Sequence, residues 1–202
     1  MEQGTGEWFQ ARLGRATASR FKDVMARLKS GEPAQARTDY MIEVVQERLT
    51  GRPAEHPVNS YMRWGTEQEP FARDAYCQRT GLAVDEVGFL KHHKLMAGCS
   101  PDGIIDLDGV LEIKCPSSNT HTETLLSGMH DKHLPQVQGA MWITGADWAD
   151  FVSFDPRMPP GLRLYIQRIE RNDIFIAGLA AAVEDFLGAV DEMVSTLLEK
   201  SR

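Results

Sequence analysis

The sequence predicts a single α/β or α+β domain in which helices flank one central mixed β-sheet. Helical periodicity dominates both ends of the 202-residue chain, whereas short apolar runs separated by turn residues occupy its middle. With 42% hydrophobic and 25% charged residues, the chain has enough apolar side chains for a full-sized core. We therefore expect one domain over residues 1–202.

Two short helices are expected near the N-terminus, over residues 8–13 and 19–28. Thr17 or Ser19 is a suitable N-cap for the second helix, and Gly31 is a suitable stop after it.

Two longer helices are expected next, over residues 32–50 and 66–80, each followed by a glycine. The first is amphipathic, and a loop with two prolines over residues 52–61 separates it from the second. Thr66 is the expected N-cap of the second helix, which puts Glu69 in its first turn.

A β-meander is predicted where the period changes, over residues 82–92, 95–106 and 109–115. The dipeptide Asp108-Gly109 is a strong signal for a hairpin turn between the last two runs. A further helix is expected over residues 133–144.

The remaining residues predict two strands and a closing helix. Residues 150–156 and 162–171 read as strands, and residues 172–199 carry apolar side chains along one face of a long amphipathic helix. These elements complete the sheet and cover it.

Composition and charge limit the function classes. The net charge of −7 argues against a protein that coats polyanions, although a local basic lining is compatible with it. No segment reaches the roughly 18 uninterrupted apolar residues of a membrane span, and the N-terminus lacks the pattern of a secretory signal. We expect a cytoplasmic protein, in which the widely spaced Cys77, Cys99 and Cys115 are reduced thiols.

Charged side chains interrupt the apolar runs at the predicted hairpin. Because side chains alternate along a strand, Glu112 and Lys114 should point to one face while Leu111 and Ile113 point to the other. Asp102, across the turn, can place its carboxylate beside that of Glu112. Two close carboxylates repel each other unless a cation lies between them.

This arrangement predicts a metal-dependent phosphodiesterase site. Hard oxygen ligands, to which the backbone carbonyl of Ile113 could add, suit Mg²⁺ or Mn²⁺. Lys114 could orient the attacking water or stabilise the transition state. The simpler interpretation is that Asp102 is a turn residue and that Glu112 and Lys114 form a solvated face. The complete string of Pro-Asp, nine residues and Glu-x-Lys on a predicted hairpin favours the catalytic interpretation.

Five ordered segments resemble the lambda-exonuclease-like, or YqaJ-type, phage recombination exonucleases of the PD-(D/E)xK nuclease superfamily. The segments are WFQARLGRATAS, WGTEQEPFAR, AGCSPDGII, LEIKCP and PQVQGAMWITG, which lie between residues 8 and 145. The resemblance implies a restriction-endonuclease-like core for the predicted mixed sheet and its helices.

The resemblance also implies roles for individual residues. Asp102 and Glu112 match metal-binding acids, with Glu69 completing the metal site, and Lys114 matches the catalytic lysine. Gln138 matches a glutamine that accompanies the catalytic groups. The DNA end and its 5′-phosphate are assigned to six residues: Arg12, Ser19, Ser100, Arg15, Gln136 and His121. Of these, Arg15 or His121 is expected in place of a further arginine of the family pattern.

The implied activity is Mg²⁺-dependent digestion of one strand of linear double-stranded DNA from its 5′ end, with one or two metal ions in each site. The resemblance further implies a ring of three subunits and a single-strand annealing protein as partner, in a bacterium or a phage-infected cell. The 3′ tails that remain would serve phage-type recombination.

Three alternatives stay open. The first is an endonuclease of the restriction or junction-resolving type, which uses the same catalytic groups. The second is not an enzyme but a non-catalytic clamp on DNA ends. A zinc site built on His92, His93 and Cys99 is the third alternative, although the spacing fits no common zinc pattern. An iron–sulfur nuclease of the superfamily is excluded, because it needs four cysteine ligands.

Overall fold

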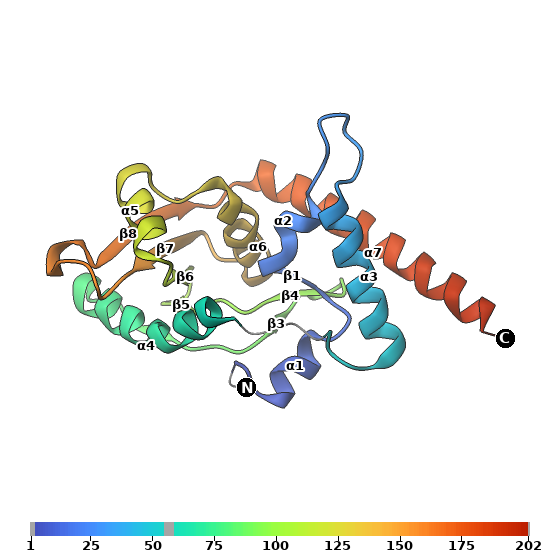
Figure 1. The fold of residues 1–202 in the computed structure, drawn as a ribbon, viewed down its shortest axis with the longest axis horizontal. Helices are drawn as coiled ribbons and strands as arrows, with labels where there is room; N and C mark the ends of the chain where they lie inside the picture. The colour runs from blue at the N-terminus through green and yellow to red at the C-terminus, as the bar shows by residue number, and fades with distance from the viewer. Residues whose placement is uncertain (1–2, 55–58, 202) are drawn as a thin grey trace.

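The computed structural model describes residues 3–54 and 59–201, and its helices lie on both sides of mixed sheets (Figure 1). A five-stranded sheet has the order β2-β5-β6-β7-β8, and a three-stranded sheet has the order β1-β4-β3. The fold class is therefore confirmed, but the single expected sheet is divided in two. The elements are α1 Gly6–Arg12, β1 Ala16–Thr17, η1 Ala18–Arg20, α2 Phe21–Val24, α3 Gln35–Thr50, α4 Ser60–Thr80, β2 Val84–Asp85, β3 Leu90–Lys91, β4 Ala97–Cys99, β5 Gly103–Ile105, β6 Gly109–Lys114, α5 Ser118–Ser127, η2 Asp131–His133, α6 Leu134–Thr144, β7 Trp148–Phe154, η3 Pro160–Leu162, β8 Leu164–Glu170 and α7 Asp173–Lys200.

Strand β6 is the centre of the larger sheet. It pairs antiparallel with β5 through the predicted hairpin, where Ile105 lies opposite Gly109, and parallel with β7. Asp106, in the turn, has a φ of 50°, which is a left-handed conformation that aspartate tolerates better than most residues. The tight turn sets the register between Asp102 and the charged end of β6.

The two faces of β6 bury different clusters. Leu111 and Ile113 pack with Tyr76 of α4 on one face. Val110 packs on the other face, in the larger cluster that includes α6 and α7. Because Glu112 and Lys114 share the parity of Val110, they lie on the α6 side of the sheet, as the alternation predicted.

The second short helix is shorter than expected. It consists of a turn of 3-10 helix followed by α2, which ends at Val24. Residues 26–34 fold back as a narrow loop, in which Leu28 N donates to Glu32 O at 2.7 Å and Ala34 N donates to Ala26 O at 3.0 Å. These backbone hydrogen bonds replace those of the predicted helix.

Helix α4 begins earlier than expected. Asn59, not Thr66, is its N-cap, and the Asn59 side chain accepts a hydrogen bond from Met62 N at 2.9 Å. Glu69 is therefore in the middle of the helix, beside the internal Pro70, and not in its first turn. Part of the predicted loop, at residues 55–58, lies outside the described residues.

Helix α6, strands β7 and β8 and helix α7 follow the predictions closely, but the predicted meander is wrong in its first two runs. Residues 82–92 supply β2 and β3 to different sheets, residues 95–106 supply β4 and β5 to different sheets, and the unpredicted β1 pairs parallel with β4. Helix α5 was not predicted, although Ser117 caps it and Gly128 follows it. The three cysteines form no disulfide, and Cys99 is buried. Within the described ranges, none of the helices combines the length and the apolar composition needed to cross a bilayer.

Candidate active site

The β5–β6 hairpin holds Asp102 against the centre of β6. Asp102 N donates to Leu111 O at 3.0 Å, and one carboxylate oxygen, Oδ2, accepts a hydrogen bond from Ile113 N at 2.6 Å. The other oxygen, Oδ1, has no hydrogen-bond partner among the described residues. One side of this carboxylate is therefore fixed while the other is available to a ligand.

Glu112, Lys114 and Gln136 form a hydrogen-bonded cluster on the α6 side of β6. Glu112 Oε1 accepts from Lys114 Nζ and from Gln136 Nε2, and Lys114 Nζ also lies 3.3 Å from Gln136 Oε1. Glu112 is 3% exposed, so its charge is balanced by groups of the protein and not by bulk water.

Glu69 approaches this cluster from α4. Its carboxylate binds Arg73 one turn later at 2.7 Å, and Arg73 Nε also donates to the backbone oxygen of Asp102 at 3.2 Å. Arg73 therefore connects the helix-borne carboxylate to the start of the catalytic hairpin. The sequence analysis missed this role, although the i,i+4 spacing of Glu69 and Arg73 was a usable signal.

These groups share one cavity with the residues expected to bind the DNA end. The cavity has a volume of about 260 Å³. We call it the catalytic cavity, and its polar lining includes Arg12, Thr17, Ser19, Glu69, Ser100, Asp102, Glu112, Lys114 and Gln136. The structure thus brings together residues from all five segments that the sequence singled out.

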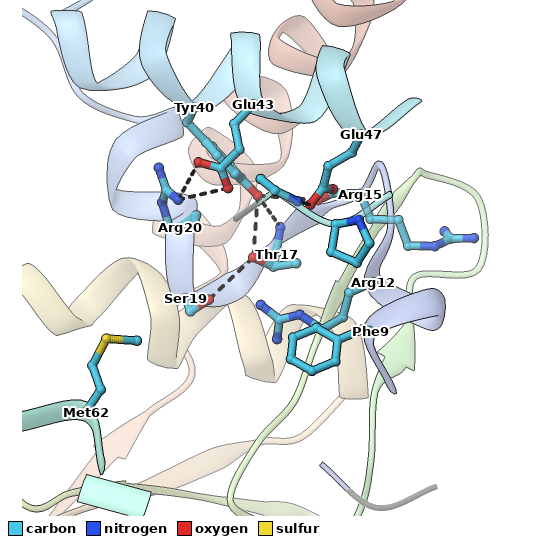
Figure 2. A pocket seen from close by; sticks show the side chains of 12 residues that line it. Phe9, Arg12, Arg15, Thr17, Ser19, Arg20, Tyr40, Glu43, Glu47 and Met62 are labelled. Carbon is cyan, nitrogen blue, oxygen red and sulfur yellow. Dashed lines mark hydrogen bonds and ion pairs between the residues drawn. The ribbon is translucent and has the colours of Figure 1, made fainter. Parts of the chain in front are cut away.

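A neighbouring cavity of about 430 Å³, here called the arginine cavity, is shown in Figure 2. Arg12 lines both cavities, and its guanidinium lies 4.0 Å from the centre of the Trp8 ring. Trp8 Nε1 in turn donates to Ser100 Oγ at 2.9 Å. Arg12 and Ser100 are therefore positioned by the same tryptophan.

Hydroxyl groups also line the arginine cavity. Thr17 Oγ1 lies 3.3 Å from Ser19 Oγ and 3.4 Å from Tyr40 Oη (Figure 2). A fixed guanidinium with hydroxyls beside it suits a phosphate monoester or diester.

Burial and repulsion between carboxylates raise the pKa values of Asp102 and Glu69. The pKa of Asp102 is raised well above its usual value, first by burial and then by the carboxylate of Glu112. The pKa of Glu69 is also raised, because burial outweighs the charge of Arg73. Burial lowers the pKa of Lys114, but the carboxylates of Glu112 and Asp102 more than compensate and raise it. Lys114 is therefore an ammonium in this arrangement.

The donor atoms of the hairpin fit a hard divalent cation. Asp102 and Glu112 supply carboxylate oxygens whose repulsion a cation would relieve, and the carbonyl oxygen of Ile113 is a neutral donor of the same hardness. Glu69 could become a ligand of the cation only if its ion pair with Arg73 were broken. In residues 3–54 and 59–201, no group of three or more His, Cys, Asp or Glu side chains is close enough to hold a metal ion. A cation here would thus depend on few protein ligands and on water, as Mg²⁺ often does.

The same observation argues against the zinc alternative. His92 packs against His93 and Trp142, with ring centres 4.4 and 4.6 Å away, and its Nδ1 accepts hydrogen bonds from the backbone. Cys99 lies buried in β4. These residues form no metal-binding group within the part of the chain that the structure describes.

Gln138 is the main correction to the predicted site. It is 1% exposed, donates to Glu170 O at 2.8 Å and accepts from Asn172 N at 2.9 Å, so it joins α6 to the start of α7. Gln136, two residues earlier, takes the position beside Lys114. Residues two apart on a helix face different directions, which is why one glutamine reaches the site and the other does not.

The predicted replacements for the additional arginine do not lie in the catalytic cavity. His121 is 0% exposed, and its two nitrogens bond Ser153 Oγ and Leu162 O, so the expectation that it contacts DNA is wrong. Arg15 lines only the arginine cavity, and Figure 2 shows its guanidinium directed away from that of Arg12. Arg12 is the arginine of the catalytic cavity's lining.

Comparisons with known proteins identify the family and the fold. A family model described as the YqaJ-like viral recombinase domain matches residues 7–147. The crystal structure of LHK-Exo, an alkaline exonuclease from Laribacter hongkongensis, has 41% sequence identity and a TM-score of 0.91, with 98% of each chain covered. The same enzyme has also been solved in complex with dAMP.

Two further similarities are more limited. A phage-related exonuclease from Haemophilus somnus shares the fold with a TM-score of 0.67 and 17% identity, over 93% of this chain and 96% of that chain. The putative uncharacterized protein ExoD of Escherichia coli (strain K12) is 35% identical over 66 residues, which are 32% of this chain and 74% of that protein.

Proposed function

Because the chain belongs to the YqaJ-like viral recombinase domain family and is a DNA nuclease of the phage exonuclease type, we propose that it digests one strand of linear double-stranded DNA from the 5′ end. The family membership and the PD-(D/E)xK fold class predicted from the five segments are confirmed. Polarity, metal and biological role belong to the proposal.

One observation carries the proposal of 5′ polarity. The catalytic cavity contains both the Asp102, Glu112 and Lys114 cluster and the phosphate-type donors Arg12 and Ser100. A strand whose terminal phosphate lies at Arg12 would place its first internucleotide phosphate near Lys114. An enzyme that cuts within a duplex would have no need for a monoester pocket so close to its catalytic lysine.

The chain's own residues have distinct roles in the proposed reaction. Asp102 and Glu112 would hold Mg²⁺ or Mn²⁺, which, when bound, would activate water and stabilise charge on the phosphate. Lys114 supplies a fixed positive charge beside the scissile phosphate, and Gln136 can hold the water or a phosphate oxygen. Arg12 and Ser100 bind the DNA end and thereby set which bond is cut.

The first experiment is digestion, with Mg²⁺, of a linear duplex labelled at either end and carrying a 5′-phosphate or a 5′-hydroxyl, beside a covalently closed circle. We expect stepwise loss of the 5′ label, faster with the phosphate, and an intact circle. A reaction with Ca²⁺ in place of Mg²⁺ serves to separate binding from cleavage.

Other results would favour the alternatives. Cutting of the circle would favour a restriction-type or junction-resolving endonuclease with the same catalytic groups. Binding of DNA ends without any cleavage would favour the non-catalytic clamp. The buried acidic cluster argues against the clamp, because carboxylates repel phosphate when no cation is present.

We further propose that three copies form a ring around duplex DNA and that the 3′ tails pass to a single-strand annealing protein. The support is the family resemblance, and a ring would reconcile a net charge of −7 with DNA binding if its basic residues face inward. Light scattering on the purified protein tests the ring, for which we expect three times the chain mass. Co-purification with an annealing protein tests the partner.

A further inference from the structure

A second polar cavity adjoins the catalytic cavity and has a volume of about 350 Å³. We call it the lysine cavity, and its lining consists of Ser19, Lys22, Lys114, Lys132, His133 and Gln136. Lys22 comes from α2, and Lys132 and His133 come from η2, more than a hundred residues later. The sequence analysis assigned no role to Lys132 or His133.

The lysine cavity differs from the catalytic and arginine cavities in its charge balance, because both of these have carboxylates in their lining. Its lining contains no carboxylate. Neither the Lys22 nor the Lys132 ammonium group has a hydrogen-bond or ion-pair partner among the described residues, whereas Arg20, Arg37 and the arginines of the other ion pairs each bind an acid. Lys114 has a counter-charge in Glu112, but Lys22 and Lys132 have none in this lining, so placing these two like charges together does not serve the stability of the fold.

His133 is the neutral ring of the lysine cavity. Its ring packs against Phe151, with the centres 5.4 Å apart. Burial, and next the charges of Lys114 and Lys132, lower the pKa of His133 to about 3. The imidazole is therefore neutral at physiological pH, and the cations of the cavity are its lysines.

The lysine cavity is continuous with the catalytic cavity through shared walls. Ser19, Lys114 and Gln136 line both, and Arg12, Thr17 and Ser19 line both the catalytic and the arginine cavity, whereas Ser19 is the one described residue that the lysine and arginine cavities share. The order is therefore arginine cavity, catalytic cavity, lysine cavity. A DNA strand presents one phosphate for each nucleotide, so a strand with its 5′-phosphate at Arg12 and its second phosphate at Lys114 would extend toward the lysine cavity.

We propose that the lysine cavity binds the third phosphate of the substrate strand, the backbone phosphodiester that follows the scissile one, through Lys22 and Lys132. This inference rests on the proposed 5′ exonuclease function and extends it by a binding site. The site holds the strand that remains after each cut, so the new 5′-phosphate stays close to the catalytic cavity. Lysine suits this task because its flexible point charge tolerates movement of the strand.

The test is a double-mutant cycle between protein and DNA. A short duplex with a 5′-phosphate carries either natural phosphodiesters or one uncharged methylphosphonate at the third phosphate, and binding is measured with Ca²⁺. We expect the wild-type protein to bind the modified duplex about fivefold more weakly, which corresponds to one solvent-exposed charged contact. The double variant Lys22→Gln, Lys132→Gln should bind both duplexes equally.

Two controls are matched to this cycle. A duplex with the methylphosphonate at the eighth phosphate should bind all proteins like the natural duplex. The double variant Lys94→Gln, Lys200→Gln removes the same charge from exposed lysines outside the cavity and should keep the wild-type preference. Thermal unfolding of each variant tests whether it is folded, and we expect little change because these lysines have no partners to lose.

The outcomes separate this inference from the proposed function. If the wild-type protein cuts DNA from the 5′ end but ignores the charge of the third phosphate, or if the lysine variant keeps the preference, the lysine cavity has another role and the inference is overturned. If the wild-type protein neither binds nor cuts linear DNA, the proposed function itself fails.

Discussion

The arginine cavity and the lysine cavity both adjoin the catalytic cavity, yet Arg20 of the first and the lysines Lys22 and Lys132 of the second are held in opposite ways. In the arginine cavity, Arg20 binds Asp23 and Glu43, and its guanidinium lies 4.2 Å from the centre of the Tyr40 ring. In the lysine cavity, Lys22 and Lys132 have no acidic partner among the described residues. A framework of fixed arginines suits recognition of one defined group, whereas unpaired lysines suit a backbone that moves at every cut.

Lys114 is intermediate between the two kinds of cation, because it lines the lysine cavity but also bonds Glu112. If its role is chemical, Lys114→Ala should reduce cleavage by about 10³-fold while DNA-end binding with Ca²⁺ stays close to wild type. Rapid-mixing cleavage assays and fluorescence anisotropy measure the two quantities. Equal loss of both would make Lys114 a binding lysine like its neighbours.

Arg12 tests the recognition that we infer for the arginine side. Because charge-assisted hydrogen bonds to a phosphate are strong, Arg12→Ala should remove a preference for 5′-phosphate over 5′-hydroxyl of about 10-fold or more. The measurement is the ratio of initial digestion rates on the two substrates.

Arg15→Ala is the matched control for Arg12, since Arg15 lies outside the catalytic cavity. It should keep the phosphate preference while slowing digestion of both substrates alike through weaker binding. If only the Arg15 variant lost the preference, the 5′-phosphate would have to bind in the arginine cavity and not in the catalytic cavity.

The two glutamines of α6 separate catalysis from packing. Gln136→Ala should slow cleavage about 10-fold, because it removes the hydrogen bonds to Glu112 and Lys114, with little change in stability. Gln138→Ala should instead lower the free energy of unfolding by about 2 kcal/mol, since it leaves the backbone groups of Glu170 and Asn172 unpaired. Urea titrations and cleavage rates are measured on both variants. If Gln138→Ala slowed cleavage and Gln136→Ala lowered stability, the sequence-based prediction that Gln138 accompanies the catalytic groups would be restored.

Substitution of Asp155 is expected to have the smallest effect on stability. Asp155 binds Arg157, an arginine with a structural role, in contrast to Arg12, for which we infer a role in recognition. Its buried carboxylate binds Arg157 at 2.7 Å and Ser118 Oγ at 2.6 Å, and Arg157 also donates to Pro116 O after β6. Although burial acts in the opposite direction, these hydrogen bonds lower the pKa of Asp155 to about 2.

The sign of the pH dependence follows from this pKa. An unfolded aspartate titrates near roughly 3.9, so the ionised form is stabilised in the folded state. The contribution of about 1 to 2 kcal/mol should be complete above about pH 5 and should be lost as the pH falls toward 2. Urea titrations of wild type and Asp155→Asn should therefore differ at pH 7 and converge at low pH; a constant difference would show that packing, not charge, is the cause.

Much of the site was predictable because it depends on local geometry. Strand alternation placed Glu112 and Lys114 on one face, and the turn at Asp108-Gly109 brought Asp102 beside them. The end of α2 and the start of α4 were harder to place. Thr66 is an acceptable cap, but Asn59 caps a longer helix, and a single chain offers no local rule that chooses between them.

Taken by itself, the sequence determined the periodicities, the hairpin and the chemistry of its charged residues. These features depend on residues that are close together along the chain, because the hydrogen bonds of a turn and the alternation of side chains along a strand involve only a few neighbours. Tertiary structure alone decided that Gln136 and not Gln138 reaches Lys114, and that Lys22 of α2 meets Lys132 of η2 in one cavity. The rotation of α6 against β6 and the approach of α2 are set by the packing of the whole core, in which Phe21, Val137 and Phe151 lie. Such packing sums many distant contacts, so no short stretch of the chain contains it.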